Sequence, residues 1–534
     1  MADGDSSSNR ETELKLAVRP QDMESLRTAP TVSGRGKGRA ATRTLEATYY
    51  DTPDRDLSAR LVSFRVRRED DRFVQTLKSA PDSDGAGLSR GEWEWVVPGP
   101  TPDFTLVTDE AALAHLDGID RTTLAPVFET HIHRTVRTIT HGDTTIEVAF
   151  DEGEVRGPTG RTHPVAEVEL ELKQGEPRAL FALARELAAV APVRVERRTK
   201  AARGYALADG TLGGAVKAGR VELDAACTVE GVLCRIVRNC LEQLGANEDC
   251  ALAGDDPEGV HQARVALRRL RSALVVFKPF LPPDQTLWLE GEVKWLAGTF
   301  GPARDWDVFL TELLAPVKAG FAGAGEHGGE VPQDLETLEA AVQKGRAEAY
   351  EAVRAALSSA RYGLFTLQVA EWLDTRGWRA QPVSEESIRL LEPIGHLADS
   401  LLTQRYRKVR KRGEGFEDLS IADRHKLRIA MKKLRYTADF FRDLYDDKPV
   451  RRYIELLGQF QDQLGHLNDV ATATRLLHAL HADGTSPSVG EARAAGVVIG
   501  WLARGTVALE PQLCDAWERF DAAKPFWSKA HRLA

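Results

Sequence analysis

From residue 11 to about residue 205 the chain alternates between hydrophobic and polar positions with a period of two. Successive side chains of a strand point to opposite faces, so this period predicts β-strands. Turn-forming residues separate many of these segments, and short helical patterns occur at 20–28, 108–116 and 176–190. Many strands with few helices predict an antiparallel sheet closed into a barrel. The predicted strands are 11–17, 42–51, 61–69, 72–79, 90–97, 128–139, 144–154 and 164–173.

Beyond about residue 220 the hydrophobic positions recur every three to four residues, which is the period of an amphipathic helix. The segments are long and predict an all-α region, most simply a helical bundle. They are 228–244, 259–279, 285–300, 337–359, 388–410, 421–443 and 450–464. We therefore expect an α+β multidomain chain. Its parts are a disordered leader (1–10), an eight-stranded antiparallel β-tunnel (11–207), a glycine-rich linker (208–222) and a helical domain (223–520).

The helical half contains an internal repeat. HQARVALRRLRSALVVF begins at residue 261 and HKLRIAMKKLRYTADFF begins at residue 425, an offset of 164 without a gap. The offset aligns histidine with histidine and four further basic residues with basic residues. This pattern predicts an internal duplication of the all-α bundle, with repeats around 225–375 and 388–520.

Composition and charge restrict the cellular setting. The chain has 534 residues and a net charge of −9, so any polyanion has to be met by local basic patches. Five cysteines without a CxxC pair indicate reduced, cytosolic usage. The polar N-terminus has no apolar signal segment, and the most apolar late stretch (494–503) is too short to span a bilayer. We expect a cytoplasmic protein without a membrane partner.

Ionisable residues alternate within several predicted strands. Glu11, Glu13 and Lys15 of ETELKLAV share one face, as do the three glutamates of AEVELELK. For one strand alone, a solvent-exposed face is the simpler explanation. In several strands together the charged faces would converge inside the closed sheet, where charges of both signs are costly without a ligand. A polyphosphate that chelates a divalent cation fits, because carboxylates hold the cation while Arg and Lys neutralise phosphate oxygens.

These strands resemble the CYTH domain, the triphosphate tunnel metalloenzymes. The resemblance rests on the ExExK pattern at residues 11–15 and, in order, on TYYDTPDRDL (48–57), SFRVRR, QTLK, RGEWEW, EVELELK and TKAARGY (199–205). It implies an eight-stranded tunnel that binds triphosphate groups with Mg²⁺ or Mn²⁺. The catalytic strand would carry Glu11, Glu13 and Lys15. The implied metal ligands are Glu11, Glu13, Glu167, Glu169 and Glu171. The implied phosphate-binding residues are Lys15, Arg65, Arg67, Lys78, Arg90, Arg134 and Lys200.

Two helices carry the repeated basic pattern. Positions i, i+3, i+7 and i+10 of a helix lie on one face. A single basic face is usually only solvated, but a repeat with histidine in register favours a groove that binds a polyanion. With FGPARDWDVF (300–309) and LGHLNDV (464–470), these helices resemble the CHAD domain, a helical domain associated with polyphosphate binding. Asn468 stands where Arg304 stood, so the two halves are not equivalent. The two faces are His261, Arg264, Arg268 and Arg271, and His425, Arg428, Lys432 and Arg435.

We therefore expect metal-dependent hydrolysis of inorganic triphosphate in the tunnel and polyphosphate binding by the helical domain. Association with polyphosphate granules is one expected location. The CYTH resemblance also admits a thiamine or nucleoside triphosphatase or an adenylate cyclase, and a non-catalytic polyphosphate-binding scaffold is an alternative of another class. Specific nucleic-acid binding is disfavoured, because the basic faces lack interleaved aromatic residues and the chain is acidic.

Overall fold

The computed structural model describes residues 9–82, 87–322, 329–466, 469–481, 484 and 486–527. Most of the leader predicted at 1–10, and Asn468, therefore lie outside the described residues. Tertiary contacts divide the chain into two compact units. The first comprises Met1–Gly214 together with Ala356–Ala380, and the second comprises Ala215–Ala355 together with Gln381–Ala534. A short stretch from the helical half of the sequence thus belongs with the strands.

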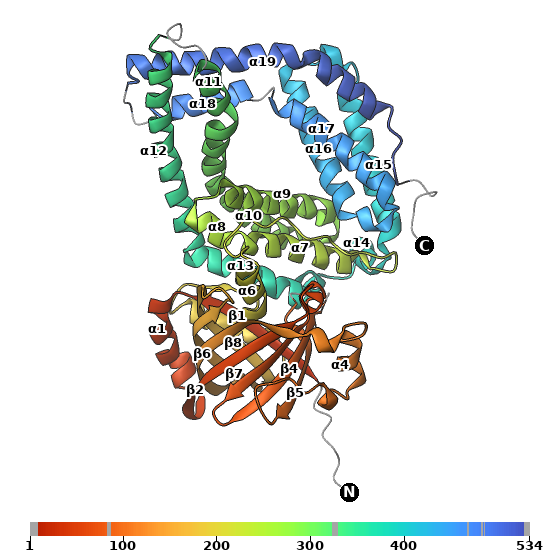
Figure 1. The fold of residues 1–534 in the computed structure, drawn as a ribbon. Coiled ribbons are helices and arrows are strands. Elements are labelled where there is room, and N and C mark those ends of the chain that lie inside the picture. Colours follow the sequence, from red (N-terminus) through yellow and green to blue (C-terminus); the bar gives the residue numbers. More distant parts are fainter. Residues whose placement is uncertain are drawn as a thin grey trace. The chain divides into compact units, whose positions relative to one another are not determined.

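Eight antiparallel strands of the first unit close into a barrel (Figure 1). The order is β5-β4-β3-β2-β6-β7-β8-β1, and β1 pairs again with β5 to close the ring. A ninth strand, β9 (Val193–Val195), pairs with β1 outside this ring. The predicted eight-stranded antiparallel tunnel is confirmed. Its strands are β1 (Arg10–Val18), β2 (Gly36–Asp51), β3 (Ser63–Glu69), β4 (Arg72–Pro81), β5 (Ser89–Val97), β6 (Ala125–His141), β7 (Thr144–Arg156) and β8 (Thr162–Gln174).

One buried apolar cluster of the first unit lies outside the barrel wall. On β3, Phe64 and Val66 point outward into a buried apolar cluster, whereas Arg65 and Arg67 of the same strand line the interior. A second cluster packs Phe128 beneath a helix that follows β9, and its residues Leu45 and Ile132 also line the cavity. Most of the side chains that face the lumen are nevertheless charged or polar. The helices of this unit are α1 (Met23–Thr28), α2 (Pro30–Ser33), α3 (Asp56–Ala59), α4 (Glu110–His115), α5 (Arg178–Ala188), α6 (Lys200–Ala208) and α13 (Ala360–Asp374).

The second unit is helical, as predicted. Among the described residues no single helix is long and apolar enough to cross a membrane; only the bent pair Val489–Thr506 and Leu509–Asp521 meets the length and composition requirement together. The helices are α7 (Val229–Ala246), α8 (Glu248–Ala253), α9 (Pro257–Phe277), α10 (Pro283–Val308), α11 (Ala315–Ala322), α12 (Val331–Leu357), α14 (Glu385–Ile388), α15 (Ile394–Gly413), α16 (Ile421–Phe440), α17 (Asp447–His466), α18 (Asp469–Ala479) and α19 (Val489–Asp521).

The internal duplication is visible in the helix boundaries. Helices α9 and α16 begin 164 residues apart, and so do α10 and α17, which matches the sequence offset. Equivalent helices also contact each other, α7 with α15 and α9 with α16. The N–H of Val229 donates to the carbonyl of Glu392 (2.9 Å), and the N–H of Ile394 donates to that of Cys227 (2.9 Å). Contacts between equivalent positions are the mark of a two-fold relation, so the repeats are arranged with pseudo-two-fold symmetry.

Candidate active site

The inward faces of the barrel strands line a cavity of about 590 Å³. Carboxylates, guanidinium groups and ammonium groups all face it. Two of the predicted tunnel residues, Glu13 and Glu167, are buried but do not line the cavity, with 8% and 0% of their surface exposed. The predicted residues that do line it are Glu11, Lys15, Arg65, Arg67, Lys78, Arg90, Arg134, Glu169, Glu171 and Lys200.

The carboxylates of β1 pair with cations from the neighbouring strands. Glu11 accepts hydrogen bonds from Lys78 Nζ (2.7 Å) and Arg90 Nε (3.1 Å), and it lies opposite Arg90 in the β1–β5 pairing. Glu13 forms ion pairs with Lys15 and Arg90. Burial opposes ionisation of Glu11 and Glu13, but Lys78, Lys15 and Arg90 outweigh it, so the pKa of each carboxyl lies below its usual value. Both groups are therefore charged at neutral pH.

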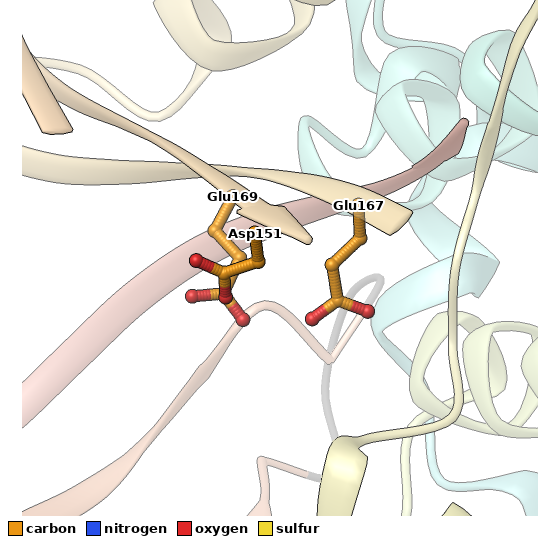
Figure 2. Close-up of side chains that lie close together, drawn as sticks. All are labelled: Asp151, Glu167 and Glu169. Atoms are coloured by element: carbon orange, nitrogen blue, oxygen red, sulfur yellow. The ribbon is translucent and has the colours of Figure 1, made fainter. Parts of the chain in front are cut away.

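Three carboxylates from β7 and β8 form a compact acidic trio (Figure 2). Asp151, Glu167 and Glu169 offer ligand atoms that all lie within 4.8 Å of one another. Asp151 is opposite Glu167 in the β7–β8 pairing, and Glu169 follows on the same face of β8. A set of three carboxylate oxygens fits Mg²⁺ or Mn²⁺, since both ions prefer oxygen ligands.

Two basic residues from outside β7 and β8 neutralise this acidic trio. Lys200 Nζ lies 2.7 Å from Asp151 Oδ2 and 2.9 Å from Glu169 Oε1, and it also pairs with Glu167. Arg134 of β6 donates to both carboxylate oxygens of Asp151 (2.7 and 2.6 Å) and pairs with Glu169. Burial opposes ionisation of Glu169, but Lys200 and Arg134 hold its pKa well below the usual range. A divalent cation would therefore compete with Lys200 for the same oxygens.

The metal ligands predicted from the sequence coincide only in part with this acidic trio. The prediction combines Glu167 and Glu169 with Glu11, Glu13 and Glu171, whereas the acidic trio contains Asp151. Glu171 instead pairs with Lys173 (2.5 Å), and burial raises its pKa. Lys15 lies between the β1 carboxylates and the acidic trio, because it pairs with Glu13 and its Nζ is 3.6 Å from Glu169 Oε1. Asp151 shares a face with Glu147 in the sequence, and that signal could have identified it.

Two further charged residues were not predicted from the sequence: Glu69, which lines the cavity, and Arg203, which does not. Glu69 lines the cavity and pairs with Arg67, with Arg72 (2.7 Å) and with Arg43 (3.9 Å). It is the next inward position after Arg65 and Arg67 on β3, so the period of two would have located it. Arg203, one turn after Lys200 on α6, pairs with Glu167.

The basic faces of the second unit also come together. Arg264 and Arg268 of α9 are among the charges that act on Lys432 of α16. A Cβ added to Gly301 would lie 3.1 Å from Arg264 Nη1, and one added to Gly465 would lie 3.5 Å from the equivalent Arg428 Nη2. The two repeats thus place their arginines alike.

Both halves of the chain match known families. Residues 9–205 match the CYTH domain family, and residues 235–478 match the CHAD domain family. The chain carries a CYTH domain and a CHAD domain.

Similar proteins are known for each domain. An inorganic triphosphatase from Haemophilus influenzae is 31% identical over 161 residues, which are 30% of this chain and 45% of that protein. A CHAD domain structure from the plant Ricinus communis is 30% identical, covers 60% of this chain and 99% of that chain, and has a TM-score of 0.49. A Hippeastrum protein named as an adenylyl cyclase, with a dominant triphosphatase activity, is 21% identical, covers 36% and 94%, and has a TM-score of 0.29.

The basic faces of α9 and α16 contribute to one group of positive charges, the CHAD basic cluster. We use this name for Arg264, Arg268, Arg271, Arg428, Lys432 and Arg435. Arg268, Lys432 and Arg435 form no ion pair with any described side chain. Burial, followed by Arg428 and Arg268, lowers the pKa of Lys432 to about 7. Such a surplus of positive charge is unfavourable by itself and favours an anionic ligand.

The two predicted histidines have different surroundings. His261 is partly buried, and burial together with Arg304 lowers its pKa to about 4. It is therefore neutral at physiological pH. His425, its equivalent in the second repeat, is exposed. The histidines are thus not equivalent in the two repeats.

Proposed function

We propose that the CYTH tunnel hydrolyses inorganic triphosphate with Mg²⁺ or Mn²⁺, and that the CHAD domain binds polyphosphate. The observation that carries the first part is the acidic trio beside a cavity lined by cations. The triphosphatase of Haemophilus influenzae supports the choice of substrate. This chain spans less than half of that protein, so the activity is a proposal for the present chain.

In this proposal the carboxylates of the tunnel bind the cation and the basic residues bind the phosphate groups. Asp151, Glu167 and Glu169 would hold the divalent cation, which supplies positive charge to the phosphate and orients water. Arg65 and Lys78 would neutralise phosphate oxygens. Lys200 is paired with all three carboxylates, and its ammonium group would bind a phosphate oxygen when these carboxylates hold the cation instead.

The proposal is tested by phosphate release from tripolyphosphate by the full chain with Mg²⁺ or Mn²⁺. Asp151→Asn and Glu11→Gln are expected to lower kcat/KM at least 100-fold. Glu152→Gln is the matched control, because Glu152 follows Asp151 on β7 and its side chain is 42% exposed. It is expected to change kcat/KM less than twofold. Metal-independent release, or full activity in Asp151→Asn, would reject the assigned roles.

The same assay separates the alternatives. Preferential release from thiamine triphosphate or ATP would favour the other triphosphatases, and formation of cyclic AMP would favour a cyclase. If none of these substrates is turned over with either metal, the chain is better described as a polyphosphate-binding scaffold.

Polyphosphate binding is tested separately by calorimetric titration of the full chain with a long-chain polyphosphate. Arg268→Ala is expected to weaken binding about 10-fold, because charged hydrogen bonds contribute about 1.5–3 kcal/mol. Arg451→Ala removes the same charge from an α17 side chain that is 63% exposed, and it should leave affinity unchanged. Equal effects of both variants would indicate non-specific attraction only.

A further inference from the structure

Helix α13 lies inside the CHAD match but belongs to the tunnel unit by its contacts. It contacts β9 and α5, both of which come from the N-terminal part of the chain. More than half of its residues are buried. The buried residues are Tyr362, Gly363, Phe365, Thr366, Leu367, Val369, Ala370 and Leu373.

The contact between α13 and β9 involves both backbones. A Cβ on Gly363 would lie 2.0 Å from the carbonyl oxygen of Val193, so only glycine permits this approach. The N–H of Val195 donates to Thr366 Oγ1 (3.2 Å). At the other end of the helix Glu371 forms an ion pair with Arg185 of α5. Three contacts of different kinds thus fix the helix in place.

Strand β9 in turn holds the strand that carries the ExExK residues. β1 pairs with β5 only over its first residues, and β9 covers the same edge further along. Val195 lies opposite Leu16 there. The N–H of the next residue, Glu196, donates to the carbonyl of Lys15 (2.9 Å). With only three residues, β9 is too short to form a stable edge strand without further packing.

We infer that α13 is a positioning element of the tunnel. It holds β9 against β1, and β9 in turn fixes the backbone of Lys15. The tunnel domain is then completed by a segment encoded within the CHAD sequence. This structural role goes beyond the proposed function, and only the activity measurement below rests on that function.

Amide hydrogen exchange of the full chain tests the inference, because it reports local opening. In Gly363→Ala, exchange at Val195 and Glu196 is expected to rise at least 10-fold, while the β6–β7 amides stay unchanged. Gly291→Ala is the matched control: it adds the same methyl group to a helical glycine of α10, where a Cβ meets nothing within 4 Å. It should leave β9 and β1 unaffected.

Thr366→Val provides a milder change if Gly363→Ala does not fold. It keeps nearly the same shape and removes the hydroxyl that accepts from Val195. Faster exchange in β9 and β1 is expected, with a lower kcat/KM for tripolyphosphate. Unchanged exchange at Val195 and Glu196 in both variants would overturn the inference, whatever the activity. If the parent chain shows no hydrolysis, the proposed function fails while the exchange result still decides the role of α13.

Discussion

Arg65 differs from the other tunnel cations in its partners. Its Nη1 donates to Tyr49 Oη (3.2 Å), and it forms no ion pair with a carboxylate of the described residues. Lys78, Arg90, Arg134 and Lys200 all pair with carboxylates. The charge of Arg65 is therefore available to a ligand without breaking an existing pair.

Arg65→Gln is accordingly expected to lower kcat/KM for tripolyphosphate about 10- to 100-fold, since a charged hydrogen bond is worth about 1.5–3 kcal/mol. Arg68→Gln is the control on the same strand, because that side chain is 56% exposed. Its kcat/KM should stay within twofold of the parent value. Steady-state kinetics at saturating Mg²⁺ measures both, and an unchanged kcat/KM in Arg65→Gln would remove Arg65 from the site.

Lys432 predicts a pH dependence of polyphosphate binding. Its pKa of about 7 means that the amine is mainly neutral at pH 8 and mainly charged at pH 6. A polyanion favours the charged form, so binding takes up a proton and affinity rises as the pH falls. A single such group gives about a 10-fold increase from pH 8 to pH 6.

Calorimetry in buffers of different ionisation enthalpy measures this proton uptake. Lys432→Met should flatten the pH profile. Lys426→Met on the same helix, whose side chain is 62% exposed, should retain the parent slope. Parallel profiles for the parent and Lys432→Met would contradict the prediction.

Most site residues could be predicted from the sequence, because strand periodicity decides which side chains face the lumen. How these side chains group within the lumen could not. Glu13 and Glu169 are both inward carboxylates, but Glu13 pairs with Arg90 from β5 and Glu169 joins Asp151 from β7. This difference depends on strand order around the barrel, which one strand's pattern does not contain.

At the scale of elements, α6 connects the outer packing to the site. Lys200 is its first residue, and the side chain of Thr199 caps the helix by accepting from the N–H of Ala202 (3.0 Å). A Cβ on Gly204 would lie 2.1 Å from the ring of Phe128. The position of this glycine therefore controls how closely α6, and with it Lys200, approaches the acidic trio.

Gly204→Ala is expected to destabilise the protein by about 1–3 kcal/mol through overpacking and to lower activity. Gly298→Ala, where a Cβ meets nothing within 4 Å, should be neutral or stabilise by about 0.5–1 kcal/mol. Urea denaturation compares the two variants. Equal stabilities would show that α6 can shift without cost.

The eight barrel strands were predictable, since each is long enough to show a period of two. The elements that support them were not. β9 has three residues and α6 has nine, so neither carries a clear period. No helix was predicted at 360–374, and the contact between α13 and β9 joins segments that lie far apart in the sequence.

At the scale of the whole molecule, the two proposed activities should be separable. The acidic trio lies in the first unit and the CHAD basic cluster in the second. Glu169→Gln is expected to abolish hydrolysis and leave polyphosphate affinity within twofold. Arg268→Ala with Lys432→Met should do the reverse. Loss of both functions in either variant, with folding intact by circular dichroism, would show that the activities depend on one another.

The origin of α13 in the later sequence also affects synthesis on the ribosome. β9 ends at Val195 and α13 begins at Ala360. At about 5–20 residues per second, translation reaches α13 roughly 8–33 s after β9 has been made. During this interval the nascent barrel exposes the edge and the apolar surface that α13 later covers. Domains that follow one another along a chain can fold in turn, but this tunnel is completed only by a segment of its neighbour, and until then its exposed edge is prone to aggregation.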